Sequence, residues 1–219
     1  MNVVNITVVS PLDRIITLGV LALDDLHVQE RDAQLDEPLA EAAARLSRGA
    51  DVEPHLAATR SMYRRMGIDP TKTRPSSEAL LRRVKKGEGL PRINTLVDIC
   101  NWCSAEFQLP YGLYDRDKLQ GNILLRVGKD GEEYQGIRKD TVHLEGRPTL
   151  ADASGPFGNP TSDSARSMVT RATSRVLLVI FVPREVPRTA LERALDITAE
   201  RALRFAHGAE VFRQIVPAS

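Results

Sequence analysis

Seven consecutive apolar residues, Val176 to Val182 (VLLVIFV), constrain the fold of this chain most strongly. A strand that is apolar at every position has both faces buried, so the run predicts a buried central strand. It is far shorter than the roughly 20 residues that cross a bilayer. The first residues, MNVVNITVVSPLDR, lack a basic start followed by a long apolar run. We therefore expect no membrane segment and no signal peptide.

Hydrophobic periodicity predicts both helices and strands around this run. The expected helices span residues 37–47, about 53–66, 76–86, 93–107 and 189–205, with Ser76 as a cap. The expected strands cover residues 3–9, 15–28 (one strand or two), 123–127, 134–137, 141–144 and 149–151, and residues 155–163 are expected to form a long loop. We expect one α+β domain over residues 1–219, with a central mixed or antiparallel sheet or a barrel-like core, flanked by helices.

Charge is distributed unevenly, although 30 Lys and Arg residues nearly balance 29 Asp and Glu residues. Residues 61–92 contain nine basic and three acidic residues, whereas residues 93–163 contain seven and eleven. Local fields affect binding more than the total charge does. A net charge of +1 therefore does not exclude a nucleic-acid partner.

Eight basic residues in this tract are candidates for phosphate contacts: Arg64, Lys72, Arg74, Arg82, Arg83, Lys85, Lys86 and Arg92. Such contacts would add affinity without sequence specificity. A solvated helix face is an equally good interpretation at this point.

Metal and cofactor chemistry find little support in the sequence. The four histidines have no metal-ligand spacing, and Cys100 and Cys103 form a single CxxC pair where a zinc site needs four ligands. We expect both cysteines to be buried small apolar residues. Two cysteines cannot form a disulfide framework, so we expect an intracellular, cytoplasmic protein. The missing ligand spacing leads us to expect no metal, and no cofactor is expected either.

The helix over residues 93–107 has two faces of different character. Ile93, Leu96, Val97, Cys100, Ser104 and Phe107 form the expected core stripe. Asn94, Asp98 and Asn101 form a polar stripe about 110° away. Asn and Asp are poor residues for a helix interior. A functional site and a structural network both remain open explanations, the second more so for Asn94 and Asp98.

The expected loop contains several short polar side chains, namely Asn159, Thr161, Ser162 and Asp163. An Asx turn or a helix cap would explain them structurally. Loops of this length are also often functional.

Several ordered motifs give the chain a family resemblance. Arg92 to Trp102 (RINTLVDICNW), Leu109 to Asp115 (LPYGLYD) and Asp117 to Gly121 (DKLQG) resemble P-I-N-N-V-V-D-I-T-N-Y, Q-P-L-H-A-F-D and D-K-L-x-G. Leu150 to Asp152 and Gly155 to Asp163 are similar to I-A-D and G-V-M-G-G-x-x-S-E. These are motifs of the tRNA-editing domain of the phenylalanyl-tRNA synthetase beta subunit. The resemblance covers about residues 60–185, and the chain is similar to the free-standing members of that family.

The resemblance implies that domain's fold and hydrolysis of the ester joining a wrong amino acid to tRNA. Asn101 matches the family's active-site Asn, and Asp163 matches the Glu that senses a tyrosine hydroxyl; both are candidate catalytic residues. Cys100 stands where Thr is usual, and Gly112 where the family has a pocket His. Candidate substrate-binding residues are Asn94, Asp98, Tyr111, Gly112, Asp115, Gly158, Asn159, Thr161 and Ser162.

These departures argue against a pocket tuned to tyrosine. Free-standing relatives include a deacylase for canavanine-charged arginine tRNA, and a pocket with Asp163, Asp115 or Asp98 would suit a cationic amino acid. We expect a trans-editing deacylase with mischarged tRNA as partner and no obligate protein partner. A catalytically silent tRNA- or protein-binding module is the alternative, and hydrolysis of a small ester or amide is a third interpretation.

Overall fold

The computed structural model describes residues 5–137 and 141–217. The apolar run forms strand β9 (Val176–Pro183), which is buried at every position. It lies inside an antiparallel sheet in the order β10-β2-β9-β3. Its partners are β2 (Ile16–Asp24), β3 (Tyr111–Asp115) and, beyond β2, β10 (Ala209–Val216). The prediction of a buried central strand is confirmed.

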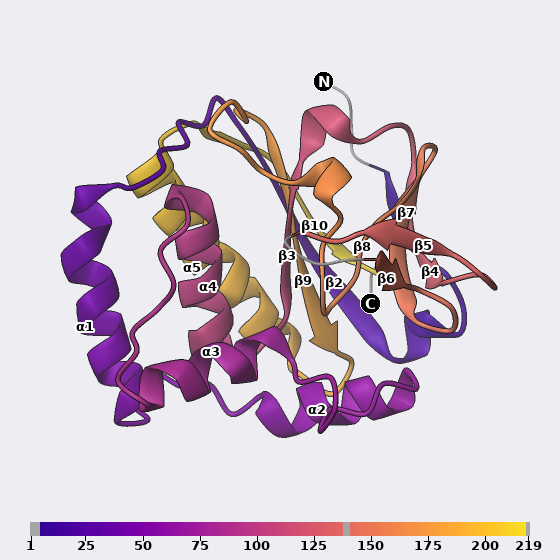
Figure 1. Ribbon diagram of the computed structural model, residues 1–219, viewed down its shortest axis with the longest axis horizontal. Helices are drawn as coiled ribbons and strands as arrows, with labels where there is room; N and C mark the ends of the chain where they lie inside the picture. The colour runs from indigo at the N-terminus through magenta and orange to yellow at the C-terminus, as the bar shows by residue number, and fades with distance from the viewer. Residues whose placement is uncertain (1–4, 138–140, 218–219) are drawn as a thin grey trace.

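Alternate residues of β9 pack into two different cores. Leu178, Ile180 and their neighbours of the same parity face the helices α1 (Asp36–Ser47), α3 (Ser76–Lys85), α4 (Thr95–Phe107) and α5 (Arg188–Ala206). Leu177, Val179 and Phe181 face the other way. Figure 1 shows the four helices on one side of this sheet and the remaining strands on the other.

The second core lies between the antiparallel sheet and a smaller mixed sheet in the order β1-β4-β7-β8. Its strands are β1 (Ile6–Val8), β4 (Ile123–Val127), β7 (Pro148–Asp152) and β8 (Gly155–Gly158), and β1 pairs with β4 in parallel. Helix α2 (Leu56–Arg65) adds Met62 and Tyr63 to this core. Strands β5 (Glu133–Gln135) and β6 (Thr141–His143) form a separate pair.

The expected α+β class, with mixed and antiparallel sheets flanked by helices, is confirmed. Short 3-10 turns at Leu12–Arg14, Ala33–Leu35, Arg116–Lys118 and Ala165–Ser167 complete the described elements. None of the helices in the described part of the chain combines the length and apolar character needed to cross a membrane. Val3, expected in the first strand, lies outside the described residues.

Some predicted boundaries are wrong. Residues 155–163 are not all loop, because Gly155–Gly158 pairs with β7; Pro156 is tolerated there because β8 is an edge strand. Helix α2 begins at Leu56 rather than near Glu53, whose N–H donates to the Glu106 carbonyl instead. Ser76 is the first residue of α3 and not its cap, since Pro75 holds that position.

The core stripe of α4 is also broader than expected. Ile93 is 37% exposed and Val97 is half-buried, whereas Trp102, Cys103 and Glu106 are buried. The reason is that α3, α5 and β3 all pack against α4. This helix is therefore covered on more than one side, which a single-stripe interpretation does not capture.

Candidate active site

The candidate site lies where the edge strands of the two sheets meet. Strand β3 is an edge of the larger sheet and β8 is an edge of the smaller one. The loop 159–163 follows β8 directly, and α4 packs against β3. Both the polar helix and the polar loop singled out in the sequence are therefore connected to β3, the helix by packing and the loop through the Tyr114–Asp163 hydrogen bond.

Asn159 gives the loop its shape. Its side-chain oxygen accepts hydrogen bonds from the backbone N–H groups of Thr161 and Ser162, each at 2.8 Å. Its amide nitrogen donates to the hydroxyl oxygen of Tyr134 at 3.0 Å. These two hydrogen bonds from the backbone form an Asx turn. Because Asn159 is also buried, the turn fixes the shape of the loop.

Three tyrosine hydroxyls from three different elements hold the same loop. Tyr63 of α2 donates to the Pro160 carbonyl at 2.7 Å. Tyr134 of β5 donates to the Ser162 carbonyl. Tyr114 of β3 donates to Oδ1 of Asp163 at 2.8 Å. The loop is therefore a fixed part of the structure and presents Asp163 in one orientation.

The Asp163 carboxyl has an unusual environment. Removal from water raises its pKa to about 7, although hydrogen bonds from Tyr114 and from the backbone N–H of Leu113 partly oppose this. The residue as a whole is half-buried. At neutral pH the group is therefore present both as an acid and as a carboxylate, and it can donate as well as accept a proton.

Cys100 lies on the buried side of α4. Burial raises the pKa of the Cys100 thiol well above its usual range, and the neighbouring Asp163 carboxylate raises it further. A thiol of this kind stays protonated at neutral pH and is a poor nucleophile.

Asn101 itself is half-buried. Across residues 5–137 and 141–217, its side-chain amide has no hydrogen-bond partner. Among the polar residues of α4 it is the one whose amide is available to a ligand.

Glycines 112 and 158 form a cradle around the ring of Tyr114. A Cβ atom at Gly112 would lie 2.1 Å from the Tyr114 hydroxyl oxygen, and one at Gly158 would lie 2.3 Å from it. Phe157 meets the same ring edge-on, with the centroids 4.8 Å apart. Tyr114 is fully buried. The space beside Gly112, where the resemblance implies an imidazole, thus holds the Tyr114 phenol.

Asn94 and Asp98 have structural partners. Asn94 caps α4 by accepting from the Val97 N–H at 3.0 Å. Asp98 is buried and accepts from the Ile93 N–H and from Nε of Arg92, both at 2.7 Å. Burial raises the pKa of Asp98 and outweighs these hydrogen bonds. The polar stripe therefore divides into two structural residues and Asn101.

Tyr111 and Asp115 point away from the Tyr114 face of β3, because side chains alternate along a strand. The Tyr111 hydroxyl lies 3.2 Å from the Thr198 hydroxyl of α5. Asp115 accepts from the Thr173 hydroxyl at 2.8 Å and pairs with Lys118 at 3.5 Å. Neither residue joins Asp163 in the site.

Only some of the basic side chains in residues 61–92 lack an ion-pair partner. Arg74 pairs with Glu78, Arg83 pairs with Glu88, and Arg92 pairs with both Asp98 and Asp36. Among the described residues, the exposed side chains of Arg64, Lys72, Arg82, Lys85 and Lys86 have no ion-pair partner within 4.0 Å. Lys72 is the least free of these because it lies near Asp69. The unpaired cations lie on α2 and α3 and on the turns after them.

Both cysteines are buried, as expected. The guanidinium of Arg201 donates to the Cys103 sulfur at 3.4 Å and stacks on Trp102, 3.7 Å from the ring centroid. Across the described ranges, no three His, Cys, Asp or Glu side chains are grouped so that they could hold a metal ion.

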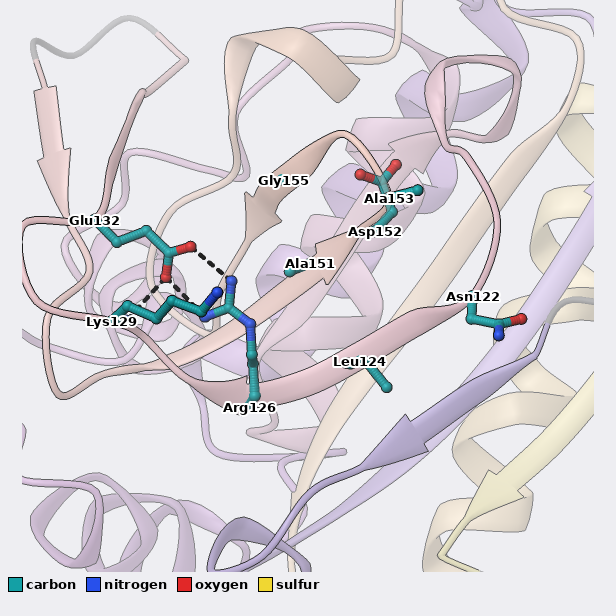
Figure 2. A pocket seen from close by; sticks show the side chains of 9 residues that line it. All are labelled: Asn122, Leu124, Arg126, Lys129, Glu132, Ala151, Asp152, Ala153 and Gly155. Atoms are coloured by element: carbon teal, nitrogen blue, oxygen red, sulfur yellow. Dashed lines mark hydrogen bonds and ion pairs between the residues drawn. The ribbon is translucent and has the colours of Figure 1, made fainter.

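Figure 2 shows a groove of about 600 Å³ on the outer face of the smaller sheet. Most charged groups near it are paired. Arg126 makes two hydrogen bonds to Glu132, at 2.6 and 2.7 Å. Asp152 is held by Arg166 at 2.9 Å. The residues that line this groove do not include Asn101 or Asp163.

The sequence motifs did not reveal the tyrosines. Tyr63, Tyr114 and Tyr134 were not among the candidate site residues, although their hydroxyls organise the loop. A signal was available for Tyr114 alone: Gly112 lies two residues before it, on the same face of a strand.

The chain has relatives among known proteins. Residues 58–216 match the family described as the B3/4 domain. The phenylalanine–tRNA ligase beta subunit of Paramagnetospirillum magneticum is 31% identical over 145 residues, which are 60% of this chain and 18% of that protein. The beta subunit of Fusobacterium nucleatum is 30% identical over 153 residues, 66% of this chain and 18% of that protein. The chain thus spans about a fifth of the length of these relatives.

A solved structure has the same fold. The crystal structure of an N-terminal fragment of the phenylalanyl-tRNA synthetase beta subunit from Pyrococcus horikoshii superposes with a TM-score of 0.52 and 16% sequence identity. The match covers 100% of this chain and 55% of the fragment. Together with the family match over most of its length, this means that the chain belongs to the B3/4 domain family, which is homologous to the editing region of the phenylalanyl-tRNA synthetase beta subunit.

Proposed function

We propose that the chain is a trans-editing aminoacyl-tRNA deacylase that acts as a free-standing protein, with residues 1–219 forming one editing-type domain. The observation that supports the proposal is the match of residues 58–216 to the B3/4 family, in which the Asp163 carboxyl is held by Tyr114 and has a pKa near neutrality. We further propose that it works in the cytoplasm without a cofactor or metal.

The proposed reaction is ester hydrolysis. Water adds to the carbonyl carbon of the aminoacyl ester, the bond to the ribose oxygen breaks, and the proton of the water ends on that oxygen. The products are a free amino acid and an uncharged tRNA. An aminoacyl ester is already activated, so a positioned water is sufficient without a protein nucleophile. This suits a site whose buried thiol stays protonated.

Asn101 and Asp163 would have different tasks. The free amide of Asn101 would orient the water or donate to the developing oxyanion, an interaction often worth about 3 kcal/mol. Asp163 would bind the α-ammonium group or the side chain of the amino acid. Its carboxylate form is the one that pairs with a cation, and binding of that cation would lower its pKa.

The proposed substrate is a tRNA mischarged with a cationic amino acid, such as canavanyl-tRNA for arginine. Three carboxylates were candidates for recognising the cation. Asp98 is bonded to Arg92 and Asp115 to Thr173 and Lys118, so Asp163 is the one that supports this proposal.

The tRNA itself would contact the surface of α2 and α3. Arg64, Lys72, Arg82, Lys85 and Lys86 are exposed there and have no ion-pair partner in the described ranges. Arg74, Arg83 and Arg92 would contribute less, because each already pairs with a carboxylate. Unpaired cations gain most from binding a phosphate.

A catalytically silent tRNA- or protein-binding module is the second candidate. One observation favours it: the Tyr114 phenol occupies the space beside Gly112 and bonds to Asp163. A site filled in this way could have lost turnover while it kept the fold and the basic surface.

A panel of charged and mischarged tRNAs separates the two candidates. Release of free amino acid from some members of the panel supports the deacylase. Asn101→Ala should slow that release at least tenfold, and Asn122→Ala, in the distant groove, is the matched control. Salt-sensitive tRNA binding with no release from any member would instead favour the silent module.

A further inference from the structure

Glu78, in the first turn of α3, is shared by two arginines. One of its carboxylate oxygens lies 3.1 Å from Nε of Arg60 on α2, and the other lies 3.4 Å from Nε of Arg74, just before α3. The Glu78 side chain is 10% exposed, whereas those of Arg60 and Arg74 are 33% and 37% exposed. One buried carboxylate therefore holds two guanidiniums that solvent can reach.

Both guanidiniums keep their hydrogen-bonding capacity. Their contacts with Glu78 are ion pairs without hydrogen-bond geometry, and neither arginine makes another hydrogen bond within residues 5–137 and 141–217. Arg126 behaves differently, because it satisfies the Glu132 carboxylate alone, with hydrogen bonds of 2.6 and 2.7 Å. A guanidinium has five N–H donors. Those of Arg60 and Arg74 are thus available to a ligand.

The charge at this junction favours an anion. Arg83 pairs with one carboxylate of its own, but Glu78 can balance only one of its two arginines. One positive charge is left, and it matches the single negative charge of a phosphodiester. The first turn of α3 adds to the positive potential, because its N-cap, Pro75, supplies no side-chain hydrogen bond and a helix N-terminus attracts anions.

We infer that Arg60 and Arg74, positioned by Glu78, bind one phosphate group of the tRNA backbone. This rests on the proposed function, because tRNA is the partner proposed there. Guanidiniums suit this task, since each can donate two parallel hydrogen bonds to phosphate oxygens. Arg60 also lies one turn before the exposed Arg64 on the same side of α2, so the phosphate site lies within the basic surface already described.

Filter binding of uncharged bulk tRNA at several salt concentrations tests the inference. Arg60→Gln/Arg74→Gln should weaken binding about tenfold and reduce the slope of log affinity against log salt by about 1 rather than 2, because both arginines neutralise the same phosphate. The matched control is Arg45→Gln/Arg213→Gln, which removes the same charge from partly exposed arginines on α1 and β10. It should change the affinity by less than about twofold, because charges far from the phosphate are screened.

Arg60→Lys/Arg74→Lys keeps both charges and the pairing with Glu78, so it remains informative if the glutamine variant does not fold. A lysine binds phosphate as a point charge and lacks the paired donors. We expect tRNA binding at least about threefold weaker than in the unsubstituted protein, with the same salt slope. A lysine variant that binds tRNA as tightly as the unsubstituted protein would overturn the inference.

Inorganic phosphate identifies the source of the phosphate group. If it raised the melting temperature of the unsubstituted protein but not of Arg60→Gln/Arg74→Gln, while tRNA bound both proteins equally, the site would be one for free phosphate and the inference would fail. Weaker tRNA binding by the arginine variants, in a protein that releases no amino acid from any tRNA, would support the inference and reject the deacylase. Deacylation by a protein whose tRNA affinity does not depend on these arginines would do the reverse.

Discussion

Tyr114 donates a hydrogen bond of 2.8 Å to Oδ1 of Asp163, which joins an edge strand of one sheet to the loop that follows an edge strand of the other. The bond favours the ionised form of the carboxyl, whereas burial favours the neutral form. Burial dominates, and the balance between the two determines the charge of the candidate site near neutral pH.

Removing the Tyr114 hydroxyl should therefore shift this balance. In Tyr114→Phe the carboxylate no longer has this donor, so we expect the pKa of Asp163 to rise above about 7. A buried acceptor left without its donor should also cost about 1–3 kcal/mol of folding free energy. Nuclear magnetic resonance titration of the Asp163 carboxyl measures the first effect and chemical denaturation the second.

Tyr63→Phe is the matched control, because it deletes another buried hydroxyl that bonds to the same loop, at Pro160. It should lower stability by a similar amount and leave the pKa of Asp163 where it is. Equal pKa values in all three proteins would contradict the role given to the Tyr114 bond.

The raised pKa of Asp163 also predicts a pH dependence of stability. The folded protein holds a proton at this site up to a pH of about 7, whereas the unfolded chain releases it near pH 4. Between these values the folded state binds more protons, so this group makes the folded protein less stable as pH rises. One pKa unit corresponds to about 1.4 kcal/mol.

Asp163→Asn mimics the neutral form and removes this dependence. We compare the unfolding free energy of Asp163→Asn with that of the unsubstituted protein at each pH. The variant's value minus the unsubstituted protein's value should increase by at least about 1 kcal/mol from pH 5 to pH 8. Urea denaturation at a series of pH values provides the measurement. A constant difference across that range would show that Asp163 titrates normally.

For Asn101 the prediction concerns catalysis alone. Asn101→Ala should lower kcat/KM for deacylation at least tenfold, which corresponds to about 1.4 kcal/mol less transition-state stabilisation. The fold should be unaffected, because the amide has no hydrogen-bond partner in the described ranges. Unchanged turnover would remove Asn101 from the mechanism.

Binding of tRNA should depend on the unpaired cations of α3 and the turn after it. Replacing Lys85 and Lys86 together by Ala should weaken binding at low salt and reduce the slope of log affinity against log salt by about 1 to 2, because each lysine would neutralise one phosphate. Lys129→Ala, in the groove of Figure 2, is the control and should leave both quantities unchanged. Filter binding at several salt concentrations measures both quantities. If the double variant binds tRNA like the control, the tRNA-binding surface lies elsewhere.

The sequence predicted the helices and strands that have a strong hydrophobic periodicity. It did not predict the strands whose periodicity is weak. Strand β9 and helices α1, α3, α4 and α5 were expected within a few residues of their observed bounds. Strands β3 and β10 were not expected: β3 is short and contains Gly112, and β10 is an exposed edge strand with Glu210, Arg213 and Gln214. Edge strands lack the apolar alternation that reveals buried ones.

Within the candidate site, local features were predictable and distant ones were not. The Asx turn of Asn159 is formed with residues two or three positions away, and the sequence already suggested it. The cap of Asn94 is equally local, but it was missed because the helix was expected to begin at residue 93. The Tyr63 hydrogen bond spans 97 residues and the Tyr114 hydrogen bond spans 49. Such bonds depend on how the two sheets pack, and an isolated sequence contains no direct signal of that packing.

The close approach of Gly112 to Tyr114 gives the last prediction. Gly112→Ala places a methyl group where the phenol oxygen lies, 2.1 Å from the new carbon atom, so the ring must move out of its cradle. Overpacking of this kind costs about 1–3 kcal/mol. In a Tyr114→Ala background the methyl group has room, and the same substitution should cost much less. A double-mutant cycle measured by urea denaturation should therefore give a coupling free energy of at least about 1 kcal/mol between the two positions. Additive effects would mean that the ring of Tyr114 does not fill the space beside Gly112.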